Sequence, residues 1–429
     1  SYNGFCVWMA AKTKPRWLKT AISVVPMPGS PYGEPWDGGI HYVGGDLGWF
    51  GLLRDRAKVQ PFNDDQTAAI NTLPISDADK VQFGHSVPGY GEMLRPERFD
   101  AQVQRSSYLE AVKGIDIPVL YFDGWLDTVA LGTRLNYATM VSHGAKNQKL
   151  IWGPWNHFTN QESRDGVTDF SPDGYVDMRT ITLRWFDRWL KDMPNGIDRE
   201  PSVDEFILGE NRWVHGDAWP PKEMRPQRWF LQPAGALDPR MPGRSEPSKY
   251  VYDPAKYVYS NANSASYFFS RGDDATALCK GAGQLLFDSA PLRRPIRLDG
   301  PIRGRLYAST NARDTDWAMA LLDVHPDGQP VVLAAGMIRA RFRKSFAHPQ
   351  LLRPGENYGY DLDMWQMGIT IPAGHRLRVV VCSTFFPDSD RNLNTGEPFA
   401  DAVRMVVANQ NIYHDSEHPS YIELPVVPK

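Results

Sequence analysis

The period of the hydrophobic residues changes near residue 200, and this change restricts the fold more than any other feature. Before it, three short apolar runs predict buried strands at residues 20–27, 117–125 and 148–155. Apolar residues at helical spacing predict helices at residues 5–19, 130–143 and 176–193. Strands that alternate with helices are typical of a parallel sheet with both faces covered. The first part of the chain is therefore predicted to be an α/β domain.

Two other segments have different patterns. Residues 28–112 begin with glycine, proline and aromatic residues and continue with a polar helical pattern, which indicates a helical cap inserted into the α/β domain. From residue 201 onward, short alternating runs are separated by Gly, Pro and Asp-Gly turns, which is typical of a β-sandwich. The predicted organisation is an α/β domain at 1–27 and 113–200, a helical cap at 28–112 and a β-sandwich at 201–429.

Composition favours a small-molecule substrate over a macromolecular or membrane partner. The 429 residues carry 47 basic and 50 acidic side chains that are interspersed along the chain. No apolar run approaches the roughly 20 residues of a membrane span. Cys6, Cys279 and Cys382 have no CxxC spacing, and neither an HExxH nor a GxGxxG pattern occurs. We therefore expect no disulfide framework, no metal, no cofactor, no nucleic acid and no membrane partner, and the oligomeric state stays open.

Candidate catalytic residues lie at three strand ends. Ser1 precedes a helical pattern, Asp127 follows the 117–125 run, and His157 follows the 148–155 run. Active sites of open α/β sheets form at the carboxyl ends of the strands, and the chain order Ser, Asp, His is that of α/β-hydrolases. Ser1 would attack an acyl carbon, His157 would take its proton, and Asp127 would orient the imidazole. The backbone N–H of Tyr2 would be one oxyanion donor.

Ser1 has a second interpretation, as the residue of an N-terminal nucleophile enzyme whose own amine is the base. The helical pattern that follows Gly4 favours a nucleophile elbow instead. An elbow needs a strand before the serine, and three parallel strands leave their edges uncovered. We therefore expect an upstream segment or companion chain to complete the sheet, and we expect the chain alone to be inactive and poorly soluble.

Several motifs resemble those of the cocaine esterase and X-prolyl dipeptidyl peptidase superfamily. They are "SYNGF", "GWLDTVALGT", "GPWNH", "RWFDRWLK", "GENRW", "DTDW", "LRPGENY" and "PDSDRNLNTGE", which together cover nearly the whole chain. The superfamily includes α-amino acid ester hydrolases and glutaryl cephalosporin acylases. The resemblance implies an α/β-hydrolase sheet with a helical cap and a C-terminal jelly-roll. It also implies a serine hydrolase of an ester or amide bond, with its triad at Ser1, Asp127 and His157.

The resemblance says less about the substrate. α-Amino acid ester hydrolases of the superfamily have acidic residues after the triad aspartate, where this chain has Val129 and Ala130. With no carboxylate pair expected there, a neutral or anionic acyl group is favoured over an amine. Substrate contacts are expected from Glu34, Trp36 and Trp155. Three activities stay open, namely those of an esterase, a cephalosporin acylase-type amidase and an X-prolyl dipeptidyl peptidase. The alternative of another class is a non-catalytic ligand-binding β-sandwich protein with a degenerate hydrolase domain.

Other polar residues are expected to be structural. Asp314 and Asp316, like Asp388 and Asp390, lie in turn-like stretches without the loop of an EF-hand, so we expect turn residues and salt bridges of the β-sandwich. His41 in the predicted cap is expected to be structural rather than part of the cleft.

Overall fold

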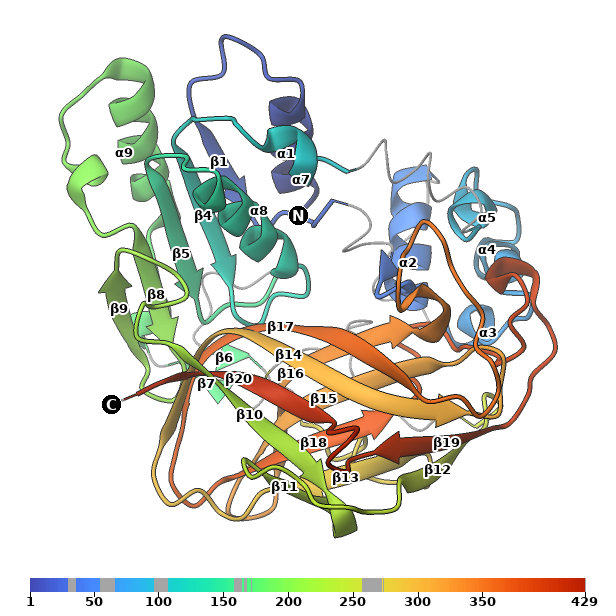
Figure 1. Cartoon of the computed structure of the whole chain (residues 1–429). Helices are drawn as coiled ribbons and strands as arrows, with labels where there is room; N and C mark the ends of the chain where they lie inside the picture. Colours follow the sequence, from blue (N-terminus) through green and yellow to red (C-terminus); the bar gives the residue numbers. More distant parts are fainter. Residues whose placement is uncertain are drawn as a thin grey trace.

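A computed structural model describes residues 1–29, 36–54, 66–95, 107–157, 164–165, 168–170, 172–256, 272 and 274–428. It shows an α/β part, a group of cap helices and a large β-rich part (Figure 1). The fold is an α/β-hydrolase sheet joined to a β-sandwich, as the sequence predicts.

The α/β part contains a five-stranded sheet with the order β1-β4-β5-β8-β9. Its strands are β1 (Ala21–Val24), β4 (Val119–Gly124), β5 (Gln148–Gly153), β8 (Val203–Ile207) and β9 (Arg212–Gly216). The first four strands are parallel, and β9 runs antiparallel to β8. The strands predicted at 20–27, 117–125 and 148–155 are therefore confirmed as β1, β4 and β5.

Helices cover both faces of this sheet, as the buried runs require. In β4, Tyr121 belongs to the hydrophobic cluster beneath the first helices, whereas Phe122 points into the cluster formed with the last helix. The helices are α1 (Tyr2–Lys12), α7 (Leu109–Val112), α8 (Leu131–Ser142) and α9 (Met178–Lys191). The first predicted helix extended to residue 19, but α1 ends at Lys12, shortly before a proline, which disfavours a helical conformation in the residue before it.

The α/β sheet continues beyond the predicted boundary at residue 200. β8 pairs with β5 in parallel, and β9 pairs with β8, so both strands extend the α/β sheet and not the β-sandwich. Their short alternating runs look like any sandwich hairpin, because hydrophobic period identifies a strand but not the sheet that it joins. The strands of the β-sandwich begin with β10 at Arg225.

The described part of the cap is mostly helical and packs on the β-sandwich. Its elements are β2 (Trp36–Asp37), β3 (Ile40–His41), α2 (Val43–Arg54), α3 (Thr67–Ile70), η1 (Ile75–Asp77), α4 (Ala78–Phe83) and α5 (Tyr90–Met93). The hydrophobic cluster of these helices includes Phe386 and Ala400 from the sandwich loops. The backbone N–H of Arg339 also donates to the carbonyl of Gly38, at 2.8 Å, which joins the β2–β3 turn to β16.

In the described part of the β-sandwich, eleven strands pair in the order β12-β19-β14-β20-β10-β11-β13-β18-β15-β16, with β17 also paired to β14. They are β10 (Arg225–Gln232), β11 (Ala236–Asp238), β12 (Ser248–Tyr252), β13 (Gln284–Asp288), β14 (Ile296–Thr310), β15 (Asp316–Val324), β16 (Pro330–Arg339), β17 (Tyr358–Ile371), β18 (Arg376–Cys382), β19 (Ala408–Tyr413) and β20 (Tyr421–Val427). Short elements elsewhere are β6 (Arg164–Asp165), β7 (Thr168–Asp169), η3 (Pro172–Gly174), η4 (Ile197–Arg199), η5 (Pro233–Gly235), η6 (Ala340–Phe342) and η7 (Phe399–Asp401).

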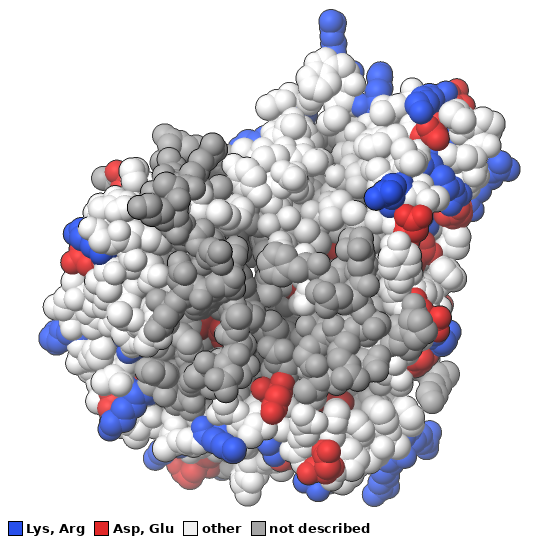
Figure 2. Space-filling model, turned by 180° about the vertical axis from the view of Figure 1, so that it is seen from behind, with Lys and Arg blue, Asp and Glu red and all other residues white. Residues whose placement is uncertain are grey.

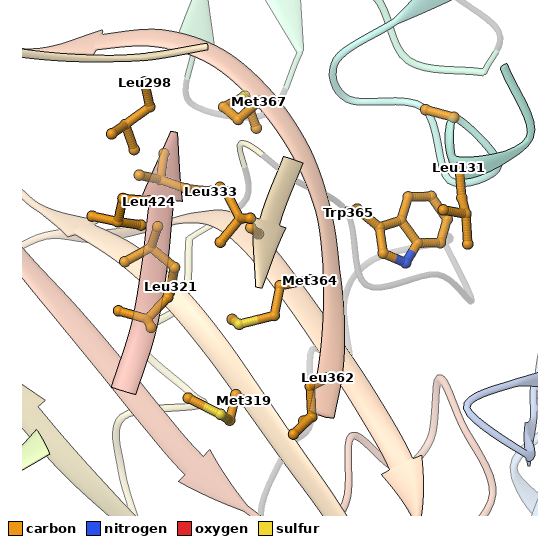
Figure 3. Close-up of a cluster of buried hydrophobic side chains, with 14 of the residues drawn as sticks. Leu131, Leu298, Met319, Leu321, Leu333, Leu362, Met364, Trp365, Met367 and Leu424 are labelled. Carbon is orange, nitrogen blue, oxygen red and sulfur yellow. The ribbon is translucent and has the colours of Figure 1, made fainter. Parts of the chain in front are cut away.

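The core of the sandwich continues to the α/β part. Gly304 of β14 faces Met319 of β15 so closely that an added Cβ would lie 2.8 Å from its sulfur atom, which shows how tightly the two strands pack. Leucine and methionine side chains gather between the strands, and Trp365 of β17 lies beside Leu131, the first residue of α8 (Figure 3). The α/β part and the β-sandwich therefore share one hydrophobic core.

On the face seen from behind, charged side chains are not segregated by sign (Figure 2). In the view from behind, Lys and Arg side chains lie among Asp and Glu side chains around the edge of the molecule (Figure 2). Among the described residues, no helix combines the length and the apolar composition that a bilayer span requires.

Candidate active site

His157 and Asp127 form a hydrogen-bonded pair beyond the carboxyl ends of β4 and β5. The Nδ1 atom of His157 lies 2.9 Å from Oδ2 and 3.1 Å from Oδ1 of Asp127. The carboxylate of Asp127 is fully buried, whereas 16% of the His157 side chain is exposed. When Nδ1–H donates to the carboxylate, the neutral imidazole carries its acceptor lone pair on Nε2. This is the tautomer that a general base in acyl transfer requires.

The register of β4 and β5 brings these two residues together. Gly124 and Gly153 are partners at the ends of the two parallel strands. Beyond them, the N–H of Trp125 donates to the carbonyl of Gly153 at 2.9 Å, and the N–H of Leu126 donates to that of Trp155 at 3.1 Å. A Cβ on Gly124 would lie 2.0 Å from the Trp155 carbonyl oxygen, so only glycine permits this approach of the two loops.

A second buried carboxyl, Asp123, lies next to Asp127 in a different environment. Asp123 accepts a hydrogen bond from the Gly124 N–H at 2.8 Å, and its other oxygen lies 2.5 Å from the Thr133 hydroxyl on α8. Burial and then the charge of Asp127 raise the pKa of Asp123 well above its usual value. Asp127 instead accepts the Val129 N–H at 2.6 Å as well as the imidazole. Asp127 is therefore the carboxyl group that pairs with His157.

Ser1 stands at the N-terminal end of α1. Its carbonyl accepts the first helical hydrogen bond, from the Phe5 N–H at 2.9 Å, and its side chain does not cap the helix. The ring of Tyr2 lies 6.1 Å from that of Trp49 in α2, so this end of the helix meets the cap. The N–H groups of the first turn, including that of Tyr2, have no partner within the helix and suit an anionic oxygen.

Gly4 explains how α1 can approach the sheet at this point. A Cβ on Gly4 would lie 2.3 Å from the Val24 carbonyl oxygen and 2.9 Å from the Cα of Pro26. Both atoms belong to the backbone that leaves β1, and they cannot move aside as a flexible side chain would. The glycine of "SYNG" therefore holds the serine-bearing turn against the end of the sheet.

The predicted substrate residues have mixed outcomes. Trp155 is 1% exposed, stacks on Phe122 with ring centroids 4.6 Å apart, and donates its indole N–H to the Gly174 carbonyl. The side chain of Trp155 is therefore packed in the core, and its predicted contact with a substrate stays a prediction. Trp36 begins β2, where its backbone pairs with His41. The side chain of Trp36 and all of Glu34 lie outside the described residues.

A small cavity lies where the three parts of the molecule meet. Its volume is about 40 Å³, and Thr128, the residue after Asp127, lines it. The cap contributes Asp37, which accepts hydrogen bonds from the Tyr42 hydroxyl at 3.1 Å and the Trp365 indole at 3.2 Å. The sandwich residues on its wall are Ala335, Gly336, Met337, Trp365, Phe385, Asp388 and Ser389.

Two acidic residues from distant parts of the chain meet at this cavity. Asp37 and Asp388 line it together with Thr128, whereas the positions shortly after Asp127 hold Val129 and Ala130. The motif "PDSDRNLNTGE" was the available signal, but its acids were assigned to turns and salt bridges because nothing in a single sequence brings residue 388 next to residue 128.

The expected salt bridges of the sandwich are confirmed for three acids. Arg339 donates hydrogen bonds to Asp316 and Asp390, and Arg341 forms an ion pair with Asp314 at 2.7 Å.

His41 is fully buried, with Nε2 2.9 Å from Asp46. Burial lowers the pKa of His41 to about 4, so it is neutral at physiological pH. Its burial between cap and sandwich makes His41 structural, as expected.

Comparison with known proteins decides the family. The family model described as X-Pro dipeptidyl-peptidase (S15 family) matches residues 1–159, and that of the X-Pro dipeptidyl-peptidase C-terminal non-catalytic domain matches residues 195–423. The chain belongs to this family. It is a serine hydrolase, and its resemblance to the cocaine esterase and X-Pro dipeptidyl-peptidase superfamily is confirmed.

Individual relatives agree with this assignment. The chain is 29% identical to the cocaine esterase of Rhodococcus sp. (strain MB1 Bresler), over all of this chain and 79% of that protein. It is similar to the structure of an α-amino acid ester hydrolase, with a TM-score of 0.82 at 25% identity over 99% of this chain and 75% of the other. An aminopeptidase from a Thaumarchaeota archaeon shares the fold, with a TM-score of 0.87 at 23% identity over 100% and 75% of the chains.

Proposed function

We propose that this serine hydrolase cleaves a small-molecule ester through an acyl-enzyme on Ser1, with His157 as general base and acid and Asp127 as its partner. The observation that carries the proposal is the bond from His157 Nδ1 to the buried carboxylate of Asp127 at 2.9 Å. A fully buried carboxylate paired with a partly exposed imidazole orients the ring and stabilises the imidazolium that forms when Nε2 takes a proton.

The reaction divides into acylation and deacylation. In acylation, Ser1 Oγ attacks the acyl carbon while His157 Nε2 takes the hydroxyl proton, and the tetrahedral oxyanion accepts the N–H of Tyr2. Collapse breaks the bond to the leaving alcohol, which receives the proton from His157. In deacylation, water attacks the acyl-enzyme as His157 takes its proton, and the same imidazole returns a proton to Ser1. Acid and alcohol are released.

We favour ester cleavage over amide cleavage because of how much of this chain each relative matches. The cocaine esterase matches all of this chain, whereas proteins named as putative Xaa-Pro dipeptidyl-peptidases match 47 to 66% of it. An acylase or X-Pro peptidase activity of the same triad is the second candidate, favoured by the S15 family model over residues 1–159. The value of kcat/KM should be measured for X-Pro amides and for esters with neutral, anionic and amine-bearing acyl groups. The comparison would rank these substrate classes.

A fluorophosphonate probe and two asparagine variants test the mechanism, with any natural sequence upstream of Ser1 retained. Wild type should form a covalent adduct at Ser1, and Ser1→Ala should form none. Asp127→Asn should lower kcat by about 10⁴, because its amide stabilises the wrong imidazole tautomer.

Asp123→Asn is the matched control. The oxygens of Asp123 accept from the Gly124 N–H and the Thr133 hydroxyl, so an amide of the same shape should leave kcat within about threefold of wild type. Equal losses in the two asparagine variants, or absence of a Ser1 adduct in folded wild type, would overturn the proposed triad. The second result would favour a ligand-binding protein.

A further inference from the structure

Three side chains with metal-binding atoms meet at one end of the β-sandwich, far from the catalytic residues in sequence. They are Asp323 near the end of β15, His325 in the turn after it, and His375 just before β18. One donor atom from each lies within 4.8 Å of the other two. No metal was expected from the sequence, because this group has no local motif and combines two segments about 50 residues apart.

The strand register explains why these three side chains converge. β15 and β18 are antiparallel, with Asp323 opposite Leu377 and Val324 opposite Arg376. Continuing this register by one residue places His325 opposite His375. Residues two apart on a strand point to the same face, so Asp323 and His325 share a face. Directly opposed residues lie side by side on that face, which adds His375 to the group.

The observed contacts agree with this arrangement. His375 Nδ1 lies 2.8 Å and 3.0 Å from the two oxygens of Asp323, and His325 Nε2 lies 3.7 Å from Oδ2 of the same carboxylate. The two imidazole rings have centroids 4.8 Å apart and are tilted by 50°. Both histidines therefore direct a nitrogen toward one carboxylate from two sides.

Burial leaves the group open on one side only. The Asp323 side chain is 7% exposed and that of His375 is 15% exposed, whereas that of His325 is 34% exposed. The backbone fixes both turns: the N–H of His325 donates to Gln329 at 2.8 Å, and the carbonyl of His375 accepts the N–H of Leu292 at 2.7 Å. The three donors are thus held by strands and turns rather than by free side chains.

We propose that Asp323, His325 and His375 bind one Zn²⁺ or a similar borderline divalent ion. Two imidazoles and one carboxylate suit Zn²⁺, Co²⁺ or Ni²⁺, whereas Ca²⁺ and Mg²⁺ require oxygen ligands. Metal–ligand bonds of about 2.0–2.2 Å put tetrahedral donors roughly 3.3 Å apart, a distance that the present separations reach by small side-chain rotations. Water or a small anion takes the fourth position, at the open side beside His325.

Binding replaces a proton with the metal ion. The Nδ1 atom of His375 can ligate only as an acceptor, so any proton that it shares with Asp323 is released to solvent when the ion enters. The ion then links the β15–β16 turn to the β17–β18 turn. The consequence is a metal-dependent increase in the stability of this end of the sandwich, because an ion that binds only the folded state stabilises it by mass action.

Zinc titration of the tag-free, chelator-treated full chain tests the site. Calorimetry should give one Zn²⁺ per chain, and Co²⁺ should develop the visible absorption of a low-coordinate site. His325→Gln and His375→Gln should each weaken binding by more than about 100-fold, since even outer-shell partners of metal ligands contribute 10–100-fold. His348→Gln, which replaces an exposed histidine outside the group, is the matched control and should bind as wild type does.

The catalytic histidine is a competing ligand, and one more variant separates the two sites. His157→Ala should retain the 1:1 binding and the zinc-dependent rise in melting temperature, whereas His325→Gln should lose both. His325 is partly exposed, so this variant should fold, and a wild-type circular dichroism spectrum would verify that. Binding that disappears in His157→Ala, persists in His325→Gln or is absent in wild type overturns the proposal.

Discussion

Removing Arg339 should destabilise the β-sandwich by an amount that depends on pH. Only 3% of its side chain is exposed, and its guanidinium makes two bonds of 2.9 Å to Asp316 and bonds of 2.8 and 3.2 Å to Asp390. Arg339→Met keeps a similar volume but leaves both carboxylates buried without their cation. Breaking a buried ion pair by removing one partner costs about 3–5 kcal/mol. At about 2–4 °C per kcal/mol, the melting temperature should fall by roughly 10 °C.

The pH dependence follows from the carboxylates that remain. Burial raises the pKa of Asp390 to about 6 even beside Arg339, and the pKa of Asp316 is also raised by burial. Without the cation, both pKa values should rise further in the folded state. A carboxyl group whose pKa is raised in the folded state destabilises the protein at pH values above that pKa. This destabilisation disappears as the pH falls to the pKa of the same group in the unfolded state. The variant's loss should therefore be largest near about pH 8 and smaller near about pH 5.

Scanning calorimetry of wild type and variant at these two pH values measures the effect. Arg404→Met is the matched control, because Arg404 forms an exposed ion pair with Glu397, and such pairs contribute about 0–1 kcal/mol. The reasoning is refuted if Arg339→Met and Arg404→Met melt alike, or if the loss in Arg339→Met is the same at both pH values.

Two further substitutions test other buried sites. The folded-state pKa of His41 is about 4, below the usual 6.5, so wild type loses stability as the pH falls from 6.5 toward 4. His41→Gln should avoid up to about 3 kcal/mol of this loss, because it has no imidazole to protonate. Melting temperatures at both ends of this pH range measure the difference. Gly4→Ala should displace α1 from Val24, lower kcat and cost about 1–3 kcal/mol, whereas Gly91→Ala, with open space around its Cα, should be tolerated in both assays.

Local patterns predicted the parts of this molecule that short segments determine. The apolar run of β4 is buried on both sides, and the polar residue that follows a parallel strand has to lie at its carboxyl end. Asp127 and His157 were therefore recognisable as neighbours from the sequence alone, since β4 and β5 are adjacent parallel strands.

The features that were missed depend on which strands pair and in what register. β8 joins the α/β sheet through its contact with β5, and nothing within "VDEFI" distinguishes that sheet from the sandwich. His375 meets His325 only because β15 and β18 pair with one particular register. Trp155 was expected in a substrate pocket, but a tryptophan at a strand end packs equally well against Phe122 in the core.

The cavity lined by Thr128 can form only after widely separated parts of the chain have been synthesised. Its walls include Asp37 from the cap and Ser389 from one of the last loops of the sandwich. A ribosome that adds about 5–20 residues per second needs roughly 20–70 seconds to pass from the first of these residues to the second. For most of that interval, the nascent chain already carries Asp37 and Thr128 but still lacks Ser389. The cavity can therefore form only after synthesis has passed residue 389, long after Asp127 and His157 have been made.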